Sequence, residues 1–65
     1  MTTEIQELIN AMKLPAAQQD TLECFVADGW EIEGNGANGS VDICRQIFDK
    51  FEYGYIRADG VFRTR

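Results

Sequence analysis

The stretch DGWEIE, residues 28–33, marks the point where the chain changes from helical to strand periodicity. Gly29 is typical of a helix end, because glycine tolerates the left-handed backbone that follows a last helical turn. Trp30 and Ile32 then alternate with two glutamates, which is the pattern of a half-buried strand. The sequence therefore predicts helix before this stretch and strands after it.

Two amphipathic helices are predicted upstream, on either side of the only proline. The first begins at Thr3 and runs for about three turns, with apolar residues at helical spacing at positions 5, 8, 9 and 12. Pro15 ends this helix and suits the first turn of the next one. The second helix is predicted over residues 16–27, which contain no further helix breaker.

Three further strands are predicted downstream and complete an α+β fold. The glycine- and asparagine-rich segment 34–39 is typical of a turn, and strands are predicted at 40–47, 51–57 and 61–64. The order ααββββ places two N-terminal helices packed on one face of a four-stranded antiparallel meander. A chain of 65 residues has room for one thin core, so residues 1–65 are expected to form a single domain.

Strand parity assigns side chains to the two faces of this sheet, if each strand buries its larger apolar set. The side chains predicted to face the helices are Trp30, Ile32, Val41, Ile43, Phe51, Tyr53, Tyr55 and Phe62. Those predicted to face away are Glu31, Glu33, Asp42, Cys44, Glu52, Gly54, Ile56, Val61, Arg63 and Arg65. The face away from the helices is therefore expected to carry mostly charge.

The charge of the chain favours a protein partner with a basic surface. Eleven acidic and six basic side chains give a net charge of −5, and residues 1–43 alone carry −7. Carboxylates gathered on one sheet face attract a basic patch on another protein. The predicted contacts are Glu31, Glu33, Asp42 and Glu52.

In size and charge the chain is similar to small acidic phage and mobile-element proteins that inhibit nucleic-acid-handling factors. The alternative is that charged edge strands only discourage strand pairing between copies.

A second hypothesis is single-stranded nucleic-acid binding through the aromatic segment 50–56. Alternating aromatic side chains on a strand stack on unpaired bases. Together with residues 59–62, this segment resembles the central hairpin of cold-shock domains, a resemblance that implies single-strand binding on a small barrel. The residues assigned to this hypothesis are Arg45, Lys50, Tyr53, Tyr55 and Arg57. The competing interpretation places the two tyrosines in the core.

Catalytic, metal and cofactor sites are not expected. The chain has no histidine, which excludes Ser–His and Cys–His nucleophiles and histidine metal sites. Residues 34–39 match the pattern G-x-G-x-x-G, but a predicted strand follows them where a dinucleotide site needs a helix. We therefore expect no enzyme and no cofactor.

The sequence also predicts the compartment and limits the assembly. An acidic start and short apolar runs predict neither a signal peptide nor a membrane span, and therefore a cytoplasmic protein. In that compartment Cys24 and Cys44 are expected to be reduced and packed. A monomer or a small homo-oligomer is expected. A third hypothesis is a structural subunit whose acidic and basic edges pair head to tail.

Overall fold

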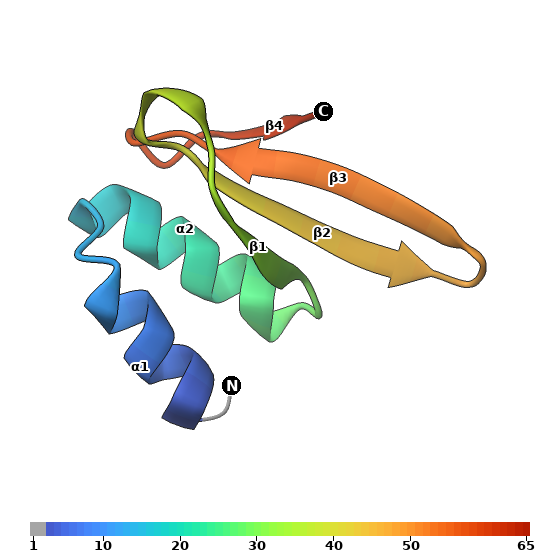
Figure 1. Cartoon of the computed structure of the whole chain (residues 1–65), viewed down its shortest axis with the longest axis horizontal. Coiled ribbons are helices and arrows are strands. Elements are labelled where there is room, and N and C mark those ends of the chain that lie inside the picture. The colour runs from blue at the N-terminus through green and yellow to red at the C-terminus, as the bar shows by residue number, and fades with distance from the viewer. Residues whose placement is uncertain (1–2) are drawn as a thin grey trace.

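The computed structural model describes residues 3–65 and confirms the predicted order ααββββ (Figure 1). The elements are α1 (Thr3–Ala11), α2 (Ala16–Ala27), β1 (Glu31–Asn35), the short 3₁₀ helix η1 (Ala37–Gly39), β2 (Val41–Ile47), β3 (Lys50–Ile56) and β4 (Phe62–Thr64). The bounds of α2 are those predicted from Pro15 and Gly29. The segment expected to be a simple turn instead contains the end of β1 and all of η1.

The sheet is an antiparallel meander with the strand order β1-β2-β3-β4. A bulge in β1 between Ile32 and Gly34 leaves Glu33 without an opposite residue on β2. Both helices lie on the same side of the sheet, and the β2–β3 hairpin extends beyond them (Figure 1). The sheet is open, so it does not form the barrel that the cold-shock resemblance implies.

The end of α2 fixes where the first strand begins. Gly29 adopts a φ of 102°, and its N–H donates to the Val26 carbonyl at 3.1 Å. The N–H of Trp30 donates to the Phe25 carbonyl, also at 3.1 Å. These two bonds form a Schellman motif, which closes the helix and turns the chain toward the sheet. The indole of Trp30 is thereby placed in the core.

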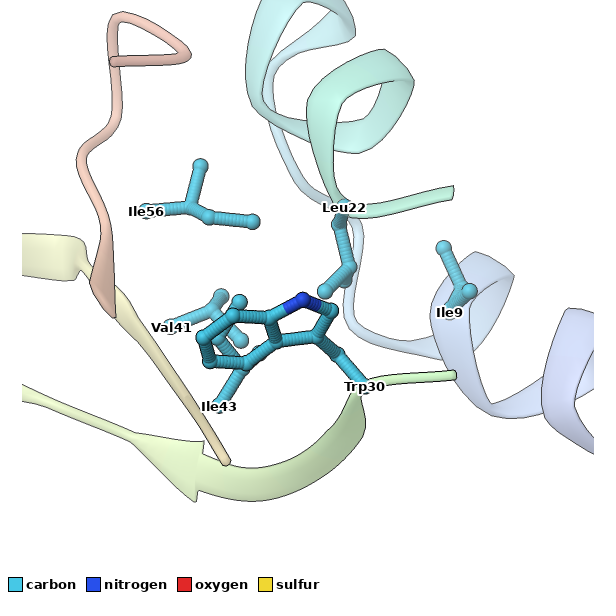
Figure 2. Packing of buried hydrophobic residues seen from close by; sticks show 6 residues of the cluster. All are labelled: Ile9, Leu22, Trp30, Val41, Ile43 and Ile56. Atoms are coloured by element: carbon cyan, nitrogen blue, oxygen red, sulfur yellow. The ribbon is translucent and has the colours of Figure 1, made fainter. Parts of the chain in front are cut away.

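The core lies between the two helices and the sheet. Its buried side chains are Ile9, Leu22, Trp30, Val41, Ile43 and Ile56, which converge in Figure 2. Phe62 packs beside them, with its ring stacked on Phe25 at 4.6 Å and edge-on to Trp30 at 5.4 Å. Buried Gln18 donates its amide to the carbonyls of Gly39 and Ile56, which ties α2 to the loop and to β3.

In strand β3 the side chains face the opposite way from the prediction. The pairs Val41–Ile56 and Ile43–Gly54 place Ile56 and Gly54 on the helix side. The predictions that Phe51, Tyr53 and Tyr55 face the helices, and that Glu52, Gly54 and Ile56 face away, are therefore wrong. A Cβ atom at Gly54 would lie 2.4 Å from Cε1 of Phe62, so the Phe62 ring occupies the space above this glycine.

The other core assignments are confirmed. Trp30, Val41 and Ile43 are buried, and Ile32 and Phe62 pack against them. The sheet surface away from the helices is called the outer face below. It carries Glu31, Glu33, Asp42, Cys44, Gln46, Phe51, Tyr53, Tyr55, Arg63 and Arg65.

Candidate protein-binding surface

Three of the four predicted partner-binding carboxylates lie on the outer face. Glu31 is opposite Cys44, and Asp42 lies on β2. Glu33 lies in the bulge of β1, and its carboxylate pairs with Arg65, the same guanidinium that Asp42 approaches. Glu52 lies on the helix side, because β3 has the opposite parity to the predicted one. Its carboxylate is 3.4 Å from the guanidinium of Arg45. The structure therefore separates Glu52 from the other three.

An aromatic row runs along β3 on the same outer face. Phe51, Tyr53 and Tyr55 alternate in sequence, so their side chains project to one side. The rings of Phe51 and Tyr53 stack with centroids 6.2 Å apart. Their residues are 56% and 44% exposed, whereas Tyr55 is half-buried. The outer face thus presents an apolar centre as well as carboxylates.

The tip of the β2–β3 hairpin adds a further exposed aromatic ring. Phe48 is 94% exposed and has a φ of 57°, in a two-residue turn closed by the pair Ile47–Lys50. Positive φ is uncommon for residues other than glycine and marks strain in a bulky residue. The strands predicted at 40–47 and 51–57 imply a reversal here. The exposure of Phe48 was not predicted, because Phe48-Asp49 lacks the Asn-Gly signal of a tight turn.

Arg65 connects the predicted acidic and basic edges across the outer face. Its guanidinium donates to Oε1 of Glu33 and lies 3.7 Å from Oδ2 of Asp42. The guanidinium carbon is 5.2 Å from the centroid of the Tyr53 ring. Two of the predicted partner-binding carboxylates therefore already hold a cation from the same chain.

The residues of the nucleic-acid hypothesis do not form one surface. Tyr53 and Tyr55 lie on the outer face, but Arg45 lies on the helix side, 4.7 Å above the Trp30 ring and 3.7 Å from the Asp28 carboxylate. Lys50 is on the helix side of the hairpin, at its closing pair.

The last of these residues, Arg57, follows β3 and pairs with Asp59 at 3.3 Å. The basic residues that do flank the tyrosines are Arg63 and Arg65, which the hypothesis had not assigned. Strand parity had placed both arginines on the face away from the helices, and the structure confirms this placement.

The two cysteines are free thiols in different surroundings. Cys24 is exposed, so the prediction that it packs is wrong, and Cys44 is half-buried on the outer face. Burial raises the pKa of the Cys44 thiol, and the carboxylates of Glu33 and Glu31 raise it further, against a smaller opposing effect of Arg65. The thiolate of Cys44 is therefore disfavoured at neutral pH.

The raised pKa of Cys44 is expected to show in thiol alkylation. Because the thiolate is the nucleophile, the rate of Cys44 alkylation should rise with pH around a midpoint above that of a cysteine in a short unstructured peptide. Glu31→Gln should lower the Cys44 midpoint by removing a nearby negative charge. Iodoacetamide labelling of the parent, of Glu31→Gln and of the reference peptide over a pH series, read by mass spectrometry, measures these midpoints. A Cys44 midpoint at or below that of the peptide would contradict the assignment.

In residues 3–65, no three His, Cys, Asp or Glu side chains gather in a way that could hold a metal ion. Neither helix of the described part is long and apolar enough to cross a membrane. Comparison of the chain with models of known families, with curated proteins and with solved structures gives no match.

Proposed function

We propose that the chain is a cytoplasmic, non-enzymatic module that binds another protein through the outer face and the tip of the β2–β3 hairpin. The observation that carries the proposal is the exposed stack of Phe51 and Tyr53 on a sheet face that no helix covers. Aromatic side chains are enriched at the centres of protein interfaces, where they contribute most of the binding energy. The free thiols are in keeping with a reducing compartment.

The flanking carboxylates indicate the charge of the partner. Glu31, Glu33 and Asp42 border the aromatic row, and the whole chain carries a net charge of −5. Complementary charge increases association rates and excludes partners of like charge. A protein with a basic surface fits this face best. Proteins that handle nucleic acid commonly bind it through basic surfaces. We therefore propose that the chain inhibits or regulates such a protein.

The proposal predicts that Phe51→Ser abolishes partner capture while leaving the fold intact. Phe51 is more than half exposed and lies beyond the core, so its removal costs little packing. Loss of a central aromatic contact typically weakens an interface by about tenfold or more. The measurement is a nuclease-treated pull-down from the source cell, followed by titration calorimetry with the captured protein after purification.

Matched variants make this test specific. Leu8→Ser removes a comparably exposed apolar side chain from α1 and should leave capture unchanged. Glu31→Lys with Glu33→Lys should weaken binding, whereas Glu4→Lys with Glu7→Lys makes the same change in net charge on α1 and should not. Equal capture by the parent and by Phe51→Ser would refute the proposal.

Single-stranded nucleic-acid binding is the second candidate function. It is favoured by one observation, that Tyr53 and Tyr55 lie on the outer face and not in the core. In this reading Arg63 and Arg65 would provide the phosphate contacts in place of Arg45, Lys50 and Arg57. The same pull-down without nuclease distinguishes the candidates, since protected nucleic acid lost with Tyr53→Ser, and no enriched protein, would favour this one.

A further inference from the structure

The guanidinium of Arg65 occupies a site that has the chemistry of an arginine receptor. Carboxylates of Glu33 and Asp42 contact its two terminal nitrogens, and the Tyr53 ring lies 5.2 Å from its central carbon. We infer that Glu33, Asp42 and Tyr53 form an arginine-binding seat, which Arg65 fills until an arginine of a protein partner displaces it. This inference rests on the proposed function and specifies the chemistry of the partner.

The three groups select arginine over lysine. A guanidinium is planar, offers its donors in a fixed fork and stacks on aromatic faces, so it can contact both carboxylates and the ring at once. A lysine ammonium is a compact, strongly hydrated point charge, which has no planar fork to match the two carboxylates and no flat face to stack on the ring. The seat therefore predicts a preference between cationic side chains that net charge alone does not explain.

The occupant is held in a way that permits exchange. The side chains of Arg65 and Glu33 are 38% and 37% exposed, so water reaches the ion pair and weakens it. The backbone of Arg65 is anchored separately, since its N–H donates to the Tyr53 carbonyl at 3.0 Å. The guanidinium can thus leave without releasing the end of the chain from β3.

Two surface hollows border Arg65. One surface hollow of about 400 Å³ is lined by Glu33, Tyr53 and Arg65. A second, of about 340 Å³, borders Arg65 on the side of Asp42 and Tyr55. An incoming side chain can therefore approach the carboxylates while Arg65 is still in place, and can replace it stepwise.

Competition from within the chain lowers the apparent affinity for an external arginine. A site that is open only a fraction of the time binds more weakly by that fraction. For an exposed ion pair of this kind, the paired form is several-fold more populated than the open form. Removal of the Arg65 side chain should therefore tighten binding of an arginine peptide by about threefold to tenfold.

The experiment compares Arg65→Ala with Arg63→Ala in the full chain, using nona-arginine and nona-lysine peptides as probes. Both variants remove one positive charge from the outer face, but Arg63 makes none of the three seat contacts. Arg65→Ala is expected to bind nona-arginine at least about threefold more tightly than Arg63→Ala does, with a smaller gain for nona-lysine. Calorimetry at one fixed salt concentration measures all four affinities.

Equal nona-arginine affinities of the two variants would overturn the inference, and Arg65 would then be a structural tie between β4 and β1.

If Arg65→Ala does not fold, NMR of the parent protein gives the answer. The Nε–H signal of Arg65 should move toward that of an unpaired arginine as nona-arginine is added. Peptide binding that leaves this signal unchanged would equally overturn the seat. Failure here with Phe51-dependent partner capture retained would refute the seat alone, and not the proposed function.

Discussion

The Gly54→Val variant is expected to lose about 3 kcal/mol of unfolding free energy, because overpacking of a filled core has costs of this size. A Cβ atom at this position would lie 2.4 Å from Cε1 of Phe62 and 3.0 Å from the Arg63 carbonyl. The Phe62 ring cannot move aside freely, since it is stacked on Phe25 and packed against Trp30. Urea denaturation followed by tryptophan fluorescence measures the loss.

A double-mutant cycle isolates the contact that causes this loss. Gly54→Ala should also destabilise the protein, and Phe62→Leu should do so by removing part of the aromatic cluster. The two changes together should cost less than the sum of the single effects, because leucine vacates space that the new methyl group needs. Strict additivity would show that Gly54 is required for a reason other than the Phe62 ring.

The same glycine explains why one strand of the fold could not be assigned from the sequence. The helices, their boundaries and the strand order follow from local signals, such as Pro15 before α2 and Gly29 after it. In β3 the rule of burying the larger side chains fails, because the Phe62 ring fills the space above Gly54. The distal half of this strand also extends past the helices (Figure 1). Its residues 50–53 are all exposed, so neither face gains burial there.

The candidate site was predictable to the extent that it depends on strand parity. Glu31, Glu33 and Asp42 share a face because β1 and β2 follow their alternation, even with the bulge. Glu52 was assigned to the wrong face of the sheet, together with the rest of β3. The seat of Arg65 depends on how far a long side chain reaches across neighbouring strands, which depends on sheet shape and not on sequence spacing.

Replacing Phe48 with glycine is expected to stabilise the fold and to weaken partner binding at the same time. A left-handed backbone disfavours residues with a Cβ atom, so Phe48→Gly should raise the unfolding free energy by about 1 kcal/mol. The ring is 94% exposed, so its removal sacrifices almost no internal packing. Loss of this projecting aromatic contact should weaken capture of the partner by about tenfold. Urea denaturation and calorimetry with the captured partner measure the two effects.

Phe48→Ala separates the two effects, because it removes the ring and keeps a Cβ atom on the left-handed backbone. Its stability should stay close to that of the parent, while its partner binding should fall as far as that of Phe48→Gly. Phe48 has a strained backbone, is nearly fully exposed and does not stabilise the fold. An intermolecular contact is the simplest explanation for an aromatic residue at this position. If both variants bind the partner as the parent does, the hairpin tip lies outside the interface, and the outer face alone would have to carry it.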